Sequence, residues 1–459
     1  MILLVAAIPI VLIPILVTQS ANDPDDIAPP MGSEFHVPAT HTEDDLYTQR
    51  VCPTLTSLPP RATNERIVSN EVFSQSAPIP DERGLNSLIW GWGQFIDHDI
   101  VLSQTDTDAP PTTLQMVPYE RNITLVRVIK RENNETLNTI TGAIDASTVY
   151  GDYKNPDKIT GLRIVGNCRM VMGPNGTPKY DGTTFECGDE RCAEHALLSS
   201  LHALLLREHN RWCDELDRTT IGWTQEQKFW QARALTIAVI QKITYDEWLP
   251  ALFGTQAYRL YQQNTAKGTS TRIATEFAAS AYRFGHSMVA NTLGELPLVS
   301  LFFNASKTIH LGLDSIFERA LHQHAEKADS KAVDGLRNIL FGMEDLVTRN
   351  LYRAREIGLP TYQDMCQCYG TTPISTSYVD PIVGLLLEPH PQGSSIGTTV
   401  AVILAEQFNR LRRNDPDFYF DQPHLFSINQ RTIIYGTTLK KLIERNTHLR
   451  NIKQNAFYL

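Results

Sequence analysis

The chain has 459 residues, of which 51 are acidic and 41 are basic, so its formal net charge is −10 at pH 7. An acidic balance without a basic stripe argues against a nucleic-acid-binding protein and gives no electrostatic reason to expect binding to an anionic membrane. Hydrophobic residues make up 42% of the chain and charged residues 20%, which is enough apolar material for one large core.

The chain begins with an almost wholly apolar segment over residues 1–17, interrupted by two prolines and followed by small residues. This pattern predicts a secretory signal peptide over residues 1–21, although no basic residue precedes the apolar core. The alternative is an uncleaved membrane anchor through residues 2–17, near the lower length limit of a spanning helix.

Residues 22–50 are acidic and rich in proline, which predicts an extended N-terminal arm. No long linker, low-complexity block or internal repeat divides the remainder. We therefore expect one large domain over residues 51–459.

The first marked helical pattern covers residues 84–99. It places Gln94, Asp97 and His98 at positions i, i+3 and i+4, which share one face of a helix. An amide, a carboxylate and an imidazole are costly to bury together without a purpose. The triplet is therefore a candidate site, and solvated charges on an ordinary helix are the alternative.

Four N-glycosylation sequons, at Asn122, Asn134, Asn175 and Asn304, fit a secretory route together with the leader.

Seven cysteines in an oxidising compartment predict disulfides. Cys168–Cys187 is the first choice, because these residues bracket a loop rich in glycine and proline. An odd count leaves at least one thiol free or intermolecular. Zinc binding by Cys366 and Cys368 is the alternative for that pair, but the spacing of one residue and the lack of a second nearby pair disfavour it.

A second helical pattern covers residues 191–217, where Arg191, Glu194 and His195 repeat the i, i+3, i+4 spacing ahead of a stripe of leucines. A third candidate is His286 in the apolar segment 272–291. One buried histidine is more often a core residue than a ligand. Three segments that each offer a polar triplet or an imidazole favour one shared buried site.

Further helical patterns cover residues 224–249, 330–343, 344–356 and 396–413, whereas strand-type alternation is scarce apart from a short hairpin over 122–130. The sequence predicts a mainly α fold, a single large helical domain with long loops and little β structure. Helices packed around an inserted cofactor suit this pattern.

These segments resemble the animal-type haem peroxidases of the peroxidase–cyclooxygenase superfamily. The family's Trp-Gly-Gln-x-x-Asp-His-Asp stands at 92–99, its Leu-Leu-Leu-Arg-Glu-His-Asn-Arg at 204–211, and its Tyr-Arg-x-Gly-His at 282–286. Shorter matches occur at 68–70, 83–85, 141–150 and 334–338. The resemblance covers the chain from about residue 50 to its end and implies a mostly helical haem-peroxidase domain.

The resemblance implies an enzyme that reduces hydrogen peroxide. His98 would take a proton from peroxide and deliver it to the departing oxygen, because the pKa of an imidazole, about 6.5, lies near working pH. Gln94 would line the same pocket and bind a water or halide. Arg191 would supply a fixed positive charge to stabilise the negative oxygen that develops.

By the same resemblance, His286 is the proximal iron ligand and Arg283 the partner of a haem propionate. Asp97 and Glu194 stand where the family forms ester bonds to haem b. Some relatives carry a methionine at the position of His195 that forms a third haem bond, so no such sulfonium link is expected here.

A calcium site is also implied, formed by the side chains of Asp99, Thr141, Asp145 and Ser147 and the carbonyl of Ala143. Alternate residues of an extended loop face one way, and hard oxygen ligands with two carboxylates suit Ca²⁺. The ion would fix the neighbouring distal histidine. The alternative is an ordinary turn that leads into a short helix.

Two departures from the family pattern lie on the proximal side. The asparagine that accepts a hydrogen bond from the proximal histidine is expected on a helix after residues 362–370. Only residues 371–380 intervene before the next apolar segment, which predicts that this helix and its asparagine are absent. The family's Arg-Gly-Arg-Asp-His-Gly also appears as Arg-Ala-Arg-Glu-Ile-Gly at 353–358. Both changes would affect the redox potential and stability of the site more than its distal chemistry.

We therefore expect a secreted haem peroxidase that oxidises a halide, thiocyanate or a phenolic or other organic donor. One alternative is an extracellular adhesion or matrix protein that keeps the scaffold with weak activity, which the proximal departures motivate. Another is a fatty-acid oxygenase relative, which needs a catalytic tyrosine near the haem. A glycosidase carboxylate pair leaves the histidines and the arginine unexplained.

Overall fold

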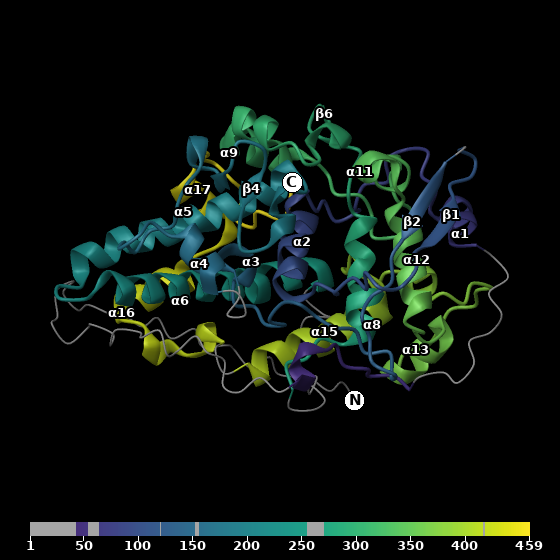
Figure 1. Ribbon diagram of the computed structural model, residues 1–459. Coiled ribbons are helices and arrows are strands. Elements are labelled where there is room, and N and C mark those ends of the chain that lie inside the picture. Colours follow the sequence, from purple (N-terminus) through teal and green to yellow (C-terminus); the bar gives the residue numbers. More distant parts are fainter. Residues whose placement is uncertain (1–42, 54–63, 120, 152–155, 255–269, 416–417) are drawn as a thin grey trace, which may run out of the picture.

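The computed structural model describes residues 43–53, 64–119, 121–151, 156–254, 270–415 and 418–459. Within these ranges the protein is mainly helical, which confirms the fold class, and the strands form three two-stranded antiparallel pairs (Figure 1). The predicted signal segment and most of the predicted arm lie outside the described residues. No described helix combines the length and apolar character needed to cross a bilayer.

The α-helices are α1 (Glu65–Phe73), α2 (Leu88–Ile100), α3 (Ser147–Tyr150), α4 (Pro156–Leu162), α5 (Ala196–Thr219), α6 (Gln225–Ile243), α8 (Thr275–Ala279), α9 (Ala305–His322), α10 (Asp334–Arg337), α11 (Leu340–Met343), α12 (Leu346–Glu356), α13 (Tyr362–Tyr369), α14 (Pro381–Leu387), α15 (Thr398–Asn414), α16 (Ile428–Gly436) and α17 (Leu439–Asn446). The 3-10 helices are η2 (Glu43–Leu46), η3 (Pro174–Gly176), η4 (Glu190–Ala193), η6 (Ala281–His286), η7 (Leu298–Leu301), η8 (Tyr419–Asp421) and η9 (Pro423–Leu425), and η5 (Thr244–Trp248) is a π-helical turn. The strands are β1 (Thr112–Gln115), β2 (Asn122–Leu125), β3 (Lys179–Tyr180), β4 (Phe185–Glu186), β5 (Thr292–Leu293) and β6 (Leu296–Pro297).

The longest helix, α5, runs through the core and packs against α6 and α9. Its leucine stripe is buried along most of its length, as its helical period predicts. Figure 1 shows α2 near the middle of the molecule, with α5, α6 and α17 on one side and α8, α12 and α13 on the other.

Helix α2 approaches α5 closely because residue 91 has no side chain. A Cβ at Gly91 would lie 2.8 Å from Cδ2 of Leu197, a distance that real Cβ atoms essentially never show. Two tryptophans fix the other side of α2. Trp92 donates to the hydroxyl of Thr244 at 3.0 Å, and Trp248 donates to the carbonyl of Ile89 at 2.8 Å. The cost of a helical glycine, about 1 kcal/mol, is therefore offset by close packing at this position.

Three of the predicted helices are broken in the structure. The 191–217 pattern divides into η4 and α5, because His195 is extended (φ −155°, ψ 162°) and caps α5. The 272–291 pattern divides into α8 and η6 at Ser280 (φ −142°, ψ −74°). The 330–343 pattern forms only α10 and α11. An apolar period does not distinguish one continuous helix from two short ones that bury the same face.

The hairpin predicted over 122–130 is partly right. Residues 122–125 do form a strand, β2, but it pairs with β1 upstream, with Thr112 opposite Leu125 and Gln115 opposite Asn122. The prediction missed β1 because strands this short carry too few alternations to show a period.

The cysteine pairing predicted from the sequence is wrong. The disulfides are Cys52–Cys368, Cys168–Cys213 and Cys187–Cys192, and Cys366 is a buried free thiol. Residues 168 and 187 flank the same loop, but Cys168 pairs with Cys213, which the packing of the loop on α5 brings close, and Cys187 pairs with Cys192 only five positions along the chain. Because Cys368 is bonded to Cys52, it is not available for the zinc alternative.

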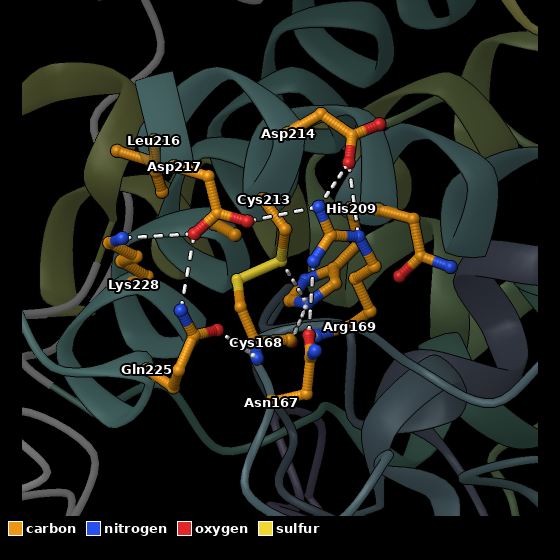
Figure 2. The surroundings of a disulfide bond; sticks show 12 residues. Asn167, Cys168, Arg169, His209, Cys213, Asp214, Leu216, Asp217, Gln225 and Lys228 are labelled. Atoms are coloured by element: carbon orange, nitrogen blue, oxygen red, sulfur yellow. Dashed lines mark hydrogen bonds and ion pairs between the residues drawn. A yellow bond between two sulfur atoms is a disulfide. The ribbon is translucent and has the colours of Figure 1, made fainter. Parts of the chain in front are cut away.

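The Cys168–Cys213 bond ties the loop after α4 to the outer half of α5 (Figure 2). Beside it, His209 contacts Sγ of Cys213 at 3.4 Å and the carbonyl of Cys168 at 3.0 Å. Arg169 reaches from the same loop to Asp217 at 3.0 Å. The disulfide, the imidazole contact and the ion pair together fix this loop against the helix.

Candidate functional site

Helix α2 carries the first group of candidate residues. Asp97, His98 and Asp99 are buried, with 8%, 4% and 0% of their surfaces exposed, and Gln94 is half-buried one turn earlier. Burial lowers the pKa of His98 well below its usual value, and the charge of Arg191 lowers it further. The imidazole is therefore neutral and able to accept a proton.

Arg191 lies on η4 and is held by a residue that the sequence analysis missed, Asp189. Its Nε and Nη2 donate to the two carboxylate oxygens of Asp189 at 2.8 and 2.7 Å, and further donors reach the carbonyls of Val101 and His98 at 3.1 and 3.3 Å. These contacts use four of the five guanidinium N–H groups. Burial alone would lower the pKa of Arg191, but the negative charges of Asp189 and, to a smaller extent, Asp97 and Glu194 outweigh burial and raise the pKa.

Glu194 and His195 complete the α2-facing side of the site. Gln94 donates from Nε2 to Oε2 of Glu194 at 2.8 Å, and Nε2 of His195 lies 2.7 Å from Oε1 of Gln94. Nε2 of His98 lies 3.8 Å from Oε2 of Glu194. Burial raises the pKa of Glu194 to about 7, with the positive charge of Arg191 acting in the opposite direction.

The 3-10 helix η6 places His286 and Arg283 one turn apart. Burial lowers the pKa of His286 to about 3, and the charge of Arg283 contributes a smaller decrease. Arg283 forms an ion pair with Asp97 at 3.1 Å, so in this structure it holds a carboxylate of α2. The hydroxyl of Tyr282 donates to the carbonyl of Gly93 at 3.1 Å and ties η6 to α2.

The proximal asparagine predicted to be absent is not absent. Asn350 on α12 places its side-chain nitrogen 2.7 Å from Nδ1 of His286. It stands three residues before the Arg353–Gly358 segment that the sequence analysis had matched to the family. The asparagine therefore lies before residue 362 and not after residue 370, and the short 371–380 connection removes nothing from the site. Asn350 stands on the predicted 344–356 helix, but the helical pattern does not mark it as the partner of His286.

The side chains from these separate segments meet in one cavity of about 230 Å³. Gln94, Asp97, His98, Arg191, Glu194, His195, Arg283, His286 and Asn350 line it, together with apolar side chains that include Ile89, Trp90, Trp248, Phe302 and Leu346. A second cavity of about 210 Å³ shares three of these residues, Arg191, Arg283 and Asn350. It adds two arginines of α12, Arg349 and Arg353, which the sequence analysis did not assign a role.

The predicted calcium ligands also lie together, with one exception. Oδ1 and Oδ2 of Asp99 accept from the amides of Thr148 and Ala146, both at 3.0 Å, and Oδ1 also accepts from Oγ of Ser147 at 3.2 Å. Burial raises the pKa of Asp99 well above its usual range, and the charge of Asp145 raises it further. Oγ1 of Thr141 lies 3.3 Å from Oγ of Ser147.

Ala143 is the exception. It lies in the bend over residues 142–145 that also holds Asp145. Its part in the calcium site stays a prediction.

Comparisons with known proteins agree with one another. The family model described as animal haem peroxidase matches residues 36–378 and 374–457. The chain is 28% identical over 478 residues to Peroxinectin A of Dictyostelium discoideum, covering 87% of this chain and 88% of that protein. It is 28% identical over 470 residues to Peroxidase mlt-7 of Caenorhabditis elegans, covering 85% of this chain and 64% of that protein.

Solved structures are similar as well. Peroxidase A from Dictyostelium discoideum superposes with a TM-score of 0.76 at 25% identity, covering 90% of this chain and 95% of that one. A fatty acid alpha-dioxygenase of Arabidopsis thaliana superposes with a TM-score of 0.77 at 18% identity, covering 90% of this chain and 80% of that one, which shows a shared fold alone.

The raised pKa of Glu194 predicts a pH-dependent stability of the haem-free protein. Between the ordinary pKa of 4.5 and the folded value of about 7, the folded protein keeps a proton that the unfolded chain releases, so stability falls as pH rises through this window. Glu194→Gln should remove the part of the loss in unfolding free energy that this carboxyl group causes, which is roughly 3 kcal/mol at most. Urea denaturation at pH 5 and at pH 8 measures the unfolding free energy of each variant.

Glu190→Gln, which changes an exposed carboxylate four residues earlier, is the matched control and should keep the wild-type dependence. Equal losses of unfolding free energy in wild type and Glu194→Gln would contradict the prediction.

Proposed function

The chain belongs to the animal haem peroxidase family, and we propose that it is a secreted peroxidase that uses H₂O₂ to oxidise a small anionic or phenolic donor. One observation supports placing the peroxidase chemistry at this site. His98, Arg191 and His286 come from three distant segments, yet all three line one cavity.

Haem is the cofactor that the family implies, and the residues present suit it. His286 offers a neutral imidazole with the side-chain amide of Asn350 beside Nδ1. A haem-iron ligand donates its other ring N–H, so Asn350 would serve with its amide oxygen, rather than its nitrogen, turned toward Nδ1. Apolar side chains of the cavity suit the faces of a flat macrocycle, and the arginines of the second cavity suit its propionates. When bound, haem supplies an iron that takes up oxidising equivalents from peroxide.

The distal residues have distinct parts in this proposal. His98 accepts the peroxide proton at Nε2 and returns it to the leaving oxygen, because its buried imidazole is neutral beforehand. Arg191 acts as a fixed charge, since Asp189 and two carbonyls hold it in place and no reorganisation is needed when negative charge develops. Gln94 keeps one amide hydrogen for the cavity, since the other is bonded to Glu194.

We infer that haem is ester-linked through Asp97 and Glu194. Both carboxyl groups line the cavity, and Oδ1 of Asp97 is a buried oxygen without a hydrogen-bond partner in the described part of the chain. Ester formation would remove the charge of Asp97. It would thereby release Arg283 from its ion pair and leave the guanidinium for a propionate.

A bound calcium ion is the third part of the proposal. Asp99 is a buried carboxylate whose pKa is raised by burial and further by the charge of the half-buried Asp145. A divalent cation between them would offset this repulsion, and the hydroxyls of Thr141 and Ser147 supply further oxygen ligands. Asp99 adjoins His98, so the ion would also stabilise the position of the distal base.

Secretion is supported by the leader pattern, three disulfides and the exposure of three sequon asparagines, Asn122, Asn175 and Asn304. The alternative of an adhesion protein with weak activity was motivated by two departures on the proximal side. Asn350 removes the first, the missing asparagine, and leaves only the altered sequence at 353–358.

The assignment of the proximal and distal histidines is tested with haem-loaded variants. His98→Ala should keep the Soret band but lower the rate of reaction with H₂O₂ by roughly 10²- to 10⁴-fold, because the general base is lost. His286→Ala should lose the Soret band or shift it strongly. Stopped-flow absorption spectroscopy measures both the Soret band and the rate of reaction with H₂O₂. His448→Ala, whose side chain is 95% exposed, is the control and should behave as wild type. A His98→Ala protein with the wild-type rate would refute the distal assignment.

The ester links are tested by acid–acetone extraction followed by mass spectrometry. Haem should stay with the wild-type protein after turnover with H₂O₂. The double variant Asp97→Asn, Glu194→Gln should release it, because an amide carries no carboxylate to form the ester. Glu190→Gln is again the matched control. Full release of haem from the wild-type protein would contradict covalent attachment.

The calcium site predicts a chelator effect that depends on Asp145. Wild-type protein should carry about one Ca²⁺ per chain and lose thermal stability in EDTA, whereas Asp145→Asn should bind calcium at least tenfold more weakly, because one of two carboxylate ligands is removed. Elemental analysis and thermal unfolding measure this. The exposed Asp108→Asn should match wild type. Equal EDTA shifts in wild type and Asp145→Asn would exclude the site.

A further inference from the structure

His195 is a buried histidine of the cavity that the proposed chemistry has not yet used. Its ring packs beside Trp90, with centroids 5.2 Å apart, and 6% of its surface is exposed. Its backbone is fixed on both sides, because it bridges to Phe302 and its carbonyl accepts the amide of Ser199 at 3.1 Å. The ring therefore occupies one defined position at the edge of the distal pocket.

The contacts of this ring determine where its proton lies. The amide of Leu198 reaches Nδ1 of His195 at 3.3 Å, and a backbone amide can only donate. Nδ1 is therefore the acceptor, and the proton of the neutral ring is on Nε2. Burial, which lowers the pKa of His195 to about 3, is consistent with a neutral ring.

This tautomer determines in turn which end of the Gln94 amide faces the ring. The Nε2–H of His195 needs an acceptor, and Oε1 of Gln94 lies 2.7 Å away. The amide nitrogen must then face Glu194, to which it donates at 2.8 Å. A side-chain amide has two N–H groups, so the second one remains for the cavity that Gln94 lines.

We propose that His195 is the positioning residue that sets the amide orientation of Gln94, and that it thereby makes this side of the cavity a hydrogen-bond donor site for a small anion. The proposal rests on the peroxidase function proposed above and deepens it. Before any ester forms, Glu194 alone does not fix the amide. Burial raises the pKa of its free carboxyl group to about 7, so it is charged or neutral near neutral pH, and the neutral group can donate to the amide oxygen instead.

His195 fixes the orientation whichever form Glu194 takes. Without a donor at residue 195, the amide can rotate and present its carbonyl oxygen to the cavity. An oxygen there repels an anion, whereas an N–H attracts it. The site would then lose its preference for anions over neutral ligands.

Fluoride, a small anion that binds ferric haem proteins and accepts hydrogen bonds, is the probe for this role. Haem-loaded His195→Leu that has not been exposed to H₂O₂, so that Glu194 keeps its free carboxyl group, should bind fluoride about tenfold more weakly than wild type in an absorption titration, because one charge-assisted hydrogen bond is lost. His195→Gln, which keeps an N–H donor of similar reach, should restore the affinity to within about threefold. Binding of CO to the reduced proteins should change less than threefold in both variants.

A fluoride affinity in His195→Leu within twofold of wild type would overturn the proposal. So would failure of His195→Gln to restore it, or a parallel loss of CO affinity, since either result indicates that His195 only packs the cavity.

Nitrogen NMR of the wild-type protein labelled with ¹⁵N-histidine tests the tautomer without haem. His195, assigned through the loss of its signals in His195→Gln, should show a neutral ring protonated at Nε2, and protonation at Nδ1 would refute the argument. A wild-type protein that takes up no haem would contradict the proposed function, while leaving this NMR result to decide the role of His195.

Discussion

The close contact between α2 and the first turn of α5 is the constraint on which the site depends. Gly91 lets the two helices approach until its Cα faces the side chain of Leu197. That distance places Gln94 and His98 within reach of Glu194. A side chain at residue 91 would push the helices apart and separate the groups on the two elements. Gly91 is thus required for close helix packing and not for backbone flexibility.

The charged side chains around the cavity are mostly paired with a side chain of opposite charge. Arg191 is paired with Asp189, and Arg283 with Asp97. Burial keeps His98 and His286 neutral by lowering the pKa of each imidazole. Removing a carboxylate from either pair would leave a buried guanidinium without its counterion, which costs more than the pair contributes. A cavity built in this way holds fixed dipoles and charges that need little rearrangement when new charge appears.

The sequence was sufficient to predict the helices that carry a long apolar period and the site residues that lie three or four positions apart on one helix. Gln94, Asp97 and His98 lie on α2 as their i, i+3, i+4 spacing predicts. One residue that it missed acts across the fold, since Asn350 lies 64 positions from His286. Asp189 lies only two positions from Arg191, but it caps a short 3-10 helix, and no apolar period marks such a contact. The predicted Cys168–Cys187 pair failed because the loop that carries Cys168 packs on α5 and pairs with Cys213, 45 positions away, which no sequence period reveals.

The shared fold does not separate a peroxidase from a fatty-acid oxygenase, since solved structures of both kinds superpose on this chain. The cavity side chains make the distinction. An oxygenase mechanism needs a tyrosine near the haem, and Tyr282 is the tyrosine that lines the described cavity. Its hydroxyl donates to the carbonyl of Gly93, and burial raises the pKa of its phenol well above the usual value. Tyr282 is therefore a buried tie between η6 and α2. The charges that act on its phenol, Asp97 and Arg283, belong to the haem attachment proposed above.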